Sequence, residues 1–221
     1  GDSAHVVSPF GARGGNGGIH DVDNLGWKLA SIFKDNTSDN ILNTYNEERI
    51  EAAKENIANS SRATNFMTPK NKMAKAFRDQ VLDLSVNNQF FRNIINSGRL
   101  SVPFKLSGLK LDNEYRDDPL LGSIYVDFPI LDRKGNRLFL TDVIANSYNL
   151  LSFSKIKIEF PFNLNIISVG EENNEDFDFL DFESKGLERY RADLNYLIRP
   201  DGYIVGIFKE INISVLEKCM L

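Results

Sequence analysis

The residues best suited to chemistry lie at the start of the chain, where one carboxylate precedes a run of glycines. The opening reads GDSAHVVSPFGARGGNGGIHDVDNLGWKLA, and six of the 15 glycines fall between Gly1 and Gly18. A helix is predicted from Asn16 onwards, so the glycine loop leads into a helix N-terminus. Glycine lets a ligand approach the backbone closely, and first-turn N–H groups carry partial positive charge. This pattern suits an electron-rich heterocycle or an anion, with Asp2 accepting hydrogen bonds from sugar or polyol hydroxyls.

The same residues also fit a plain tight turn between a strand and a helix, in which the glycines serve only backbone geometry. The loop is not a GxGxxG dinucleotide fingerprint, and it lacks the Gly-Lys-Ser/Thr ending of a P-loop. The residue types alone leave both interpretations open.

The opening resembles the second FAD-binding motif of flavin-dependent aromatic hydroxylases. These single-component flavoprotein monooxygenases form the para-hydroxybenzoate, phenol and 3-(3-hydroxyphenyl)propionate hydroxylase family. Their motif is GD(A/S)AH, a proline, a glycine loop ending in asparagine, and a helix reading D-x-x-N-L-x-W-K-L, and residues 1–30 match all of it. The similarity continues through YNEERIEAAKENI to SGRLSVP. It returns weakly at LIRPDGYIVGIF, which resembles the last hairpin of the family's thioredoxin-like C-terminal domain.

The resemblance implies a role in cofactor binding for specific residues. Asp2 would accept hydrogen bonds from the ribityl chain of FAD, and Pro9 would lie beside the flavin ring. Gly15 and Asn16 would donate backbone N–H groups to the flavin pyrimidine oxygen. Arg13 would add positive charge near the ring. The cofactor-binding set is therefore Asp2, Pro9, Gly11, Arg13, Gly14, Gly15 and Asn16, and no residue is assigned as catalytic or as a metal ligand.

Three further residues of the motif are predicted to be structural. His5 is expected to pack or to make hydrogen bonds rather than to act as a catalytic base. Trp27 and Lys28 are expected to be helix-packing and surface positions. The acidic and basic residues of YNEERIEAAKENI are expected to form surface or interdomain pairs, as in the family helix.

The function implied by the resemblance is hydroxylation of a phenolic ring, with FAD as cofactor, NAD(P)H as reductant and O2 as co-substrate. Because the chain begins with Gly1 inside a motif and contains no GxGxxG, we expect a C-terminal fragment that lacks the Rossmann segment. Such a chain would bind FAD weakly and be inactive alone. Its expected partners are a separate Rossmann chain, which would rebuild the site, or a second copy of itself. The alternative is a non-catalytic thioredoxin-like interaction module, without a dithiol, from a split or decayed gene.

Composition narrows the other classes of function. The net charge of −5 argues against nucleic acid as a partner, and two histidines with one cysteine leave no material for a zinc or disulfide framework. No apolar run reaches transmembrane length and no signal peptide opens the chain, so a cytoplasmic location is expected. Cys219, without a second thiol, is expected to be inert.

The predicted fold class is α/β (α+β). We expect residues 1–105 to be part of an FAD-binding domain, 106–119 to be a linker and 120–221 to be a thioredoxin-like domain. In the first part, helices are predicted from Asn16, after Asp39 or Asn40, and over 72–95, where Gly98 would end the last helix.

In the second part, short strands and helices are predicted to alternate. Strands are expected over 123–131, 138–140, 150–153, 156–160 and 164–169, and helices over 140–148, 187–194 and 211–216. A hairpin should turn at Arg199-Pro200-Asp201-Gly202. The acidic run EENNEDFDFLDFES lacks EF-hand spacing and is predicted to be a solvated, mobile loop, or to be anchored by Phe177, Phe179 and Phe182.

Overall fold

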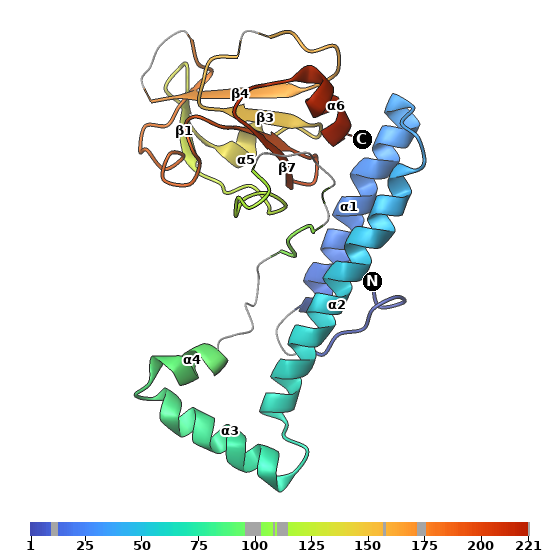
Figure 1. Cartoon of the computed structure of the whole chain (residues 1–221), viewed down its shortest axis with the longest axis vertical. Helices are drawn as coiled ribbons and strands as arrows, with labels where there is room; N and C mark the ends of the chain where they lie inside the picture. The colour runs from blue at the N-terminus through green and yellow to red at the C-terminus, as the bar shows by residue number, and fades with distance from the viewer. Residues whose placement is uncertain are drawn as a thin grey trace. The chain divides into compact units, whose positions relative to one another are not determined.

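A computed structural model of the chain describes residues 1–9, 13–95, 103–107, 109, 115–156, 158–171 and 176–220. The chain divides into two compact units, Gly1–Phe104 and Lys105–Leu221. Unit 1 is helical and unit 2 is built on a sheet (Figure 1). Mixed α and β structure confirms the predicted fold class.

The described part of unit 1 contains four helices in chain order. They are α1 (Arg13–Asp35), α2 (Ile41–Met67), α3 (Lys72–Ser85) and α4 (Gln89–Ile95). The first begins three residues earlier than the predicted Asn16, so the later glycines of the loop are helical. Asn71 caps α3 by accepting a hydrogen bond at Oδ1 from the backbone N–H of Ala74 at 2.8 Å.

The predicted helix over 72–95 is two helices with a break after Ser85. Arg92 stabilises the break, since its Nε donates to the carbonyl of Ser85 at 2.7 Å and its Nη2 donates to the carbonyl of Val86. Asn88 starts α4 by accepting a hydrogen bond from the backbone N–H of Phe90 at 2.9 Å. Gly98, the predicted stop, lies outside the described residues.

The two long helices α1 and α2 lie side by side (Figure 1) and contact each other through polar as well as small side chains. On α1 the buried positions after Arg13 are spaced at four, three and four residues, which places them on one face. They are Gly17, Asp21, Asn24 and Lys28. On α2 the buried positions include Arg49, Ala52, Ala53 and Ser60. Apolar side chains of α1 instead remain exposed, with Ile19 at 67%, Val22 at 72% and Phe33 at 81%.

The described part of unit 2 contains a seven-stranded sheet in the order β2-β1-β5-β4-β3-β6-β7. Its strands are β1 (Pro129–Asp132), β2 (Arg137–Phe139), β3 (Asn149–Ser152), β4 (Asn165–Gly170), β5 (Phe179–Leu180), β6 (Asn195–Ile198) and β7 (Ile204–Phe208), with helices α5 (Leu140–Val143) and α6 (Ile213–Met220). β4 is parallel to β3 and to β5, and the other pairs are antiparallel. The sheet is thus mixed, with two parallel pairs, and the thioredoxin-like character of residues 120–221 stays a prediction.

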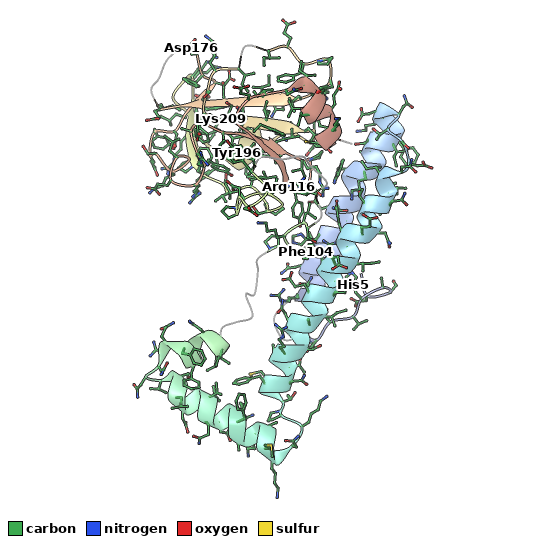
Figure 2. The ribbon with its side chains drawn as sticks, viewed as in Figure 1. His5, Phe104, Arg116, Asp176, Tyr196 and Lys209 are labelled. Carbon is green, nitrogen blue, oxygen red and sulfur yellow. The ribbon has the colours of Figure 1, made fainter. Side chains whose placement is uncertain are left out.

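The core of unit 2 lies against this sheet and is rich in aromatic and aliphatic side chains. Tyr190 is held inside it, because its hydroxyl donates to the carbonyl of Val126 at 2.8 Å and accepts from the N–H of the same residue at 2.6 Å. Burial raises the pKa of the Tyr190 hydroxyl well above its usual value. Tyr196 stands on β6 in the sheet (Figure 2) and packs edge-on against Tyr190, with ring centroids 4.9 Å apart.

The predicted hairpin is confirmed. β6 and β7 are joined at Arg199-Pro200-Asp201-Gly202, where the N–H of Gly202 donates to the carbonyl of Arg199 at 2.8 Å. Gly202 has φ of +82°, which L side chains rarely adopt. The Arg199 guanidinium donates to both carboxylate oxygens of Asp201, at 2.8 and 2.7 Å, and both side chains are buried.

The acidic run is not a mobile loop over the residues that the structure describes. β5 lies within it and pairs with β1 and β4, so this part of the run is an interior strand of the sheet. Basic side chains neutralise its carboxylates, with Arg133 2.9 Å from Asp178 and Arg137 3.1 Å from Glu183. The prediction of a solvated loop was wrong because Phe179 packs against the core, which corresponds to the alternative of phenylalanine anchors.

Other predicted elements of unit 2 need correction. The strand predicted over 123–131 begins only at Pro129, and the described residues of 156–160 form no strand. The helix predicted over 140–148 ends at Val143, and 187–194 forms turns instead of a helix. The last helix is Ile213–Met220 rather than 211–216. Within the described residues, no helix is long and apolar enough to cross a membrane.

Candidate cofactor site at the start of α1

The first two turns of α1 present glycine backbone to open space. Gly15 and Asn16 are exposed, and Gly14 is half-buried. A Cβ added at Gly15 or Gly18 would meet no atom of the described chain within 4 Å, whereas one at Gly14 would lie 3.3 Å from a methyl of Val7. Packing within the described chain therefore does not require glycine at position 15, and the surface leaves room for a ligand to approach the backbone.

The electrostatics of this helix start favour electron-rich groups. The first four N–H groups of a helix lack an intrahelical acceptor, and the dipole of the 23-residue α1 places partial positive charge there. No acidic side chain occupies the first turn to offset that charge. The site can therefore stabilise negative charge on a bound carbonyl oxygen.

Residues 1–9 lie beside the second turn of α1. The backbone turns at once, since the N–H groups of Ala4 and His5 donate to the carbonyl of Gly1 at 2.9 and 3.0 Å. The imidazole of His5 would lie 3.6 Å from a Cβ added at Gly17. Asp2 and Pro9 are exposed, and Gly11 lies outside the described residues.

Arg13 faces the interface between the two long helices. Its side chain is buried, and its Nη1 donates to Oδ1 of Asn56 on α2 at 2.8 Å. The guanidinium thus joins the start of α1 to α2. Of the seven predicted cofactor residues, the structure exposes Asp2, Pro9, Gly15 and Asn16 and partly exposes Gly14.

A buried carboxylate that sequence reasoning did not select, Asp21, organises this end of the unit. Its Oδ2 accepts from Nε2 of His5 and from the terminal amine, both at 2.7 Å, and its Oδ1 accepts from Nε of Arg49 at 2.7 Å. Burial alone would raise the pKa of this carboxyl. Hydrogen bonds from the terminal amine, Arg49 and His5 outweigh burial and lower the pKa to about 2. His5, shown beside α1 and α2 in Figure 2, has the predicted hydrogen-bonding role.

A second polar cluster lies two turns further along α1. Nζ of Lys28 donates to Oδ1 of Asn24 at 2.8 Å and to Oε2 of Glu48 at 3.1 Å, and Nδ2 of Asn24 donates to the same glutamate oxygen at 2.7 Å. The Lys28 side chain is wholly buried. The prediction of a surface position for Lys28 was wrong, and the motif residues Glu48 and Arg49 pair across the helix interface instead of at a surface. The helical spacing of Asp21, Asn24 and Lys28 is the sequence signal that could have identified this face.

Comparison with known proteins shows what the chain is similar to. Residues 1–60 match the family model of an FAD binding domain. The chain is 37% identical over 160 residues to the 3-(3-hydroxy-phenyl)propionate/3-hydroxycinnamic acid hydroxylase of Mycolicibacterium smegmatis, covering 70% of this chain and 28% of that protein. It is 57% identical over 49 residues to the tetracenomycin B2 monooxygenase-dioxygenase of Streptomyces olivaceus, covering 22% of this chain and 9% of that protein.

Solved structures share the fold. A ternary complex of aklavinone-11 hydroxylase with FAD and aklavinone matches with a TM-score of 0.67 at 21% identity, covering 97% of this chain and 42% of that chain. CabE, an aromatic hydroxylase from angucycline biosynthesis, matches with a TM-score of 0.65 at 19% identity, covering 96% and 42%. The chain thus spans less than half of the solved chains, and 27 to 28% of the hydroxyphenylpropionate hydroxylases that match it over 70% of its length. The FAD binding domain match over residues 1–60, the hydroxylase relatives and the shared fold together support a resemblance of the chain to FAD-dependent aromatic hydroxylases.

Proposed function

We propose that this chain supplies one wall of an FAD site in a monooxygenase that hydroxylates phenolic rings with NAD(P)H and O2. The observation that carries the proposal is the open, glycine-lined start of α1 beside residues 1–9. Those residues hold Asp2 at the surface, and they lie within the stretch that matches an FAD binding domain.

The residues fit the flavin end of FAD. Bound FAD would supply electron transfer from NAD(P)H and the activation of O2. The backbone N–H of Gly15, in the first turn of α1, would donate to the pyrimidine carbonyl with Asn16 beside it, and the positive end of α1 would stabilise negative charge on the reduced ring. Asp2 would orient the ribityl chain by accepting its hydroxyl hydrogens, and Pro9 would border the ring and exclude water there.

The adenosine half of FAD needs further contacts. The sequence contains no GxGxxG, and the chain spans 27 to 28% of its hydroxyphenylpropionate hydroxylase relatives. We therefore propose that a Rossmann-type segment, in a longer protein or in a separate chain, completes the site. Exposed apolar side chains on α1, namely Ile19, Val22 and Phe33, offer it a contact surface. Without that segment we expect weak FAD binding and no hydroxylase activity.

A non-catalytic role for unit 2 is the second candidate. The unit has its own aromatic and aliphatic core, and its one thiol is unsuited to redox chemistry. Cys219 is buried, and burial raises the pKa of its thiol to about 11, so little thiolate forms at neutral pH. Unit 2 would then serve as an interaction domain without a dithiol.

The test of the FAD proposal is the variant Gly15→Ala. The added methyl meets no atom of the described chain, and alanine favours helix over glycine by up to about 1 kcal/mol, so folding should be preserved. A methyl at the flavin edge should weaken FAD binding at least about tenfold, measured by quenching of flavin fluorescence. Gly26→Ala, at an equally open helical position farther along α1, is the matched control. Equal FAD affinity of Gly15→Ala and the parent chain would contradict the proposed site.

A further inference from the structure

One face of α2 carries hydroxyl, amide and guanidinium groups that hold the candidate site together. Arg49, Asn56, Ser60 and Thr64 follow one another at intervals of seven, four and four residues, so they share a face of the helix. We call these four residues the α2 polar stripe. Their spacing extends over about 22 Å of helix, at roughly 1.5 Å per residue.

The C-terminal half of the stripe, Ser60 and Thr64, binds residues 1–9. Oγ of Ser60 donates to the carbonyl of Ser8 at 3.0 Å, and the hydroxyls of Thr64 and Ser8 form a hydrogen bond at 2.6 Å. These bonds join positions 52 and 56 residues apart in the sequence. The contact is well shielded, because Ser60 is 2% exposed.

The N-terminal half of the stripe, Arg49 and Asn56, binds the start of α1. Arg49 donates from Nε to Asp21 and from Nη2 to the carbonyl of Gly17 at 3.4 Å. Asn56 accepts at Oδ1 from Arg13, the first residue of α1. The same Asp21 accepts from His5, which connects the two halves of the site. One helix face therefore contacts both segments that carry the proposed cofactor residues.

We propose that the α2 polar stripe consists of positioning residues for the flavin, which fix residues 1–9 relative to the first turns of α1. This inference rests on the proposed FAD site. Residues 1–9 contain a turn but no helix or strand, so hydrogen bonds to the rest of the unit determine where they lie. Fixing them before the cofactor arrives would lower the entropic cost of binding and so raise affinity, although the stripe residues are not among those assigned to the flavin.

The first measurement needs no cofactor. Thr64→Val removes the hydroxyl at nearly constant volume, Ser60→Ala removes its neighbour on the stripe, and Thr64→Ser retains the hydroxyl. Hydrogen–deuterium exchange of the backbone amides of residues 2–8 should quicken about fivefold in Thr64→Val and Ser60→Ala, because each loses a hydrogen bond to Ser8. Ser61→Ala, an adjacent exposed serine on α2, should leave the exchange unchanged. Unchanged exchange in both stripe variants would overturn the inference.

The second measurement is FAD titration of the same full-length variants. Thr64→Val and Ser60→Ala should weaken binding about three- to tenfold, while Thr64→Ser and Ser61→Ala bind like the parent. In combination with Asp2→Ala, the effect of Thr64→Val should shrink, because the stripe acts through the segment that carries Asp2. Fully additive effects would overturn the positioning role. If the parent chain bound no FAD, the proposed function and the cofactor role would both fail. The exchange data would still decide whether the stripe holds residues 1–9.

Discussion

The ammonium of Lys28 is wholly buried and lies 3.1 Å from Oε2 of Glu48, across the interface between α1 and α2. This pair shows that the interface depends on matched polar groups. The aromatic rings of Trp27 and Tyr45 lie 5.7 and 6.0 Å from the same ammonium and provide further favourable contact. Because the polar face of α1 is turned inward, its apolar residues remain available for another surface.

Removing one partner of this pair should destabilise unit 1 strongly. Lys28→Met keeps the bulk of the side chain but leaves the Glu48 carboxylate, which is 15% exposed, without its cation. The expected loss of unfolding free energy is about 2 to 4 kcal/mol, below the full cost of a wholly buried pair because Glu48 retains its bond from Asn24 and some water. Trp27 is the only tryptophan, so its fluorescence during urea unfolding reports on unit 1.

The matched control for Lys28 is Lys54 on α2. Lys54 pairs with Glu51 at 2.7 Å, with both side chains more than half exposed, so Lys54→Met should change the stability by less than about 1 kcal/mol. The double variant Lys28→Met with Glu48→Leu should recover much of the loss, because no unpaired charge remains. A Lys28→Met variant as stable as Lys54→Met would contradict a structural role for the buried pair.

Lowering the pH should reduce the free energy of unfolding of unit 1, because Asp21 becomes protonated. The pKa of this carboxyl is lowered from 3.8 to about 2 in the folded chain, so the unfolded state binds the proton more tightly. The stabilisation is fully present above pH 3.8 and is lost as the pH falls through about 2. It contributes about 2 kcal/mol at neutral pH. Asp21→Asn should lose this amount at pH 7 and approach the stability of the parent near pH 2.

The measurement is urea unfolding at a series of pH values between 7 and about 2, followed by Trp27 fluorescence. Asp83→Asn, at an exposed position on α3, should give a curve parallel to that of the parent. A constant difference between Asp21→Asn and the parent over the whole range would show that Asp21 does not titrate in the expected window.

Local patterns in the sequence were enough to predict part of this fold. The hairpin at Arg199–Gly202 was predicted because Pro200 and Gly202 favour a turn whatever surrounds them. Residues 187–194 were predicted as a helix but form turns, because side-chain hydroxyls make hydrogen bonds there that a helix would not allow. The Tyr190 hydroxyl bonds to Val126, 64 residues earlier in the sequence, and the backbone N–H of Arg191 donates to the Tyr196 hydroxyl. The first of these bonds is long-range and the second joins residues only five apart, and neither leaves a periodic signal in the sequence.

In the candidate site too, residues in a local motif could be predicted, whereas those that depend on contacts between helices could not. The glycine loop and Asp2 were chosen from a contiguous motif. In the structure Asp2, Gly15 and Asn16 are exposed, and the segment that carries Asp2 lies beside the start of α1, which carries the other two. Asp21 was missed, because its importance depends on Arg49, which lies 28 residues later on another helix. Its place on the face of α1 that also carries Lys28 is the one local indication of burial. The apolar Val22, next to Asp21 in the sequence, is instead 72% exposed.

The turn of the last hairpin offers a final test, because unit 2 contains two arginine–aspartate pairs of identical spacing and opposite exposure. Arg199 and Asp201 are 7% and 1% exposed, whereas Arg191 and Asp193 are 57% and 48% exposed. Asp201→Ala would leave the Arg199 guanidinium buried beside Tyr203 without its anion. The expected loss is about 3 to 5 kcal/mol of unfolding free energy.

Asp193→Ala removes an equivalent ion pair from an exposed position and should leave the unfolding midpoint unchanged, since water solvates Arg191 in its place. The measurement is urea unfolding followed by near-ultraviolet circular dichroism of the tyrosines, several of which lie in the core of unit 2. Because the two variants delete the same side chain at the same spacing, the difference between their midpoints isolates the effect of burial. Equal midpoints would mean that the hairpin turn is held by its backbone alone, with Pro200 and Gly202 sufficient to form it.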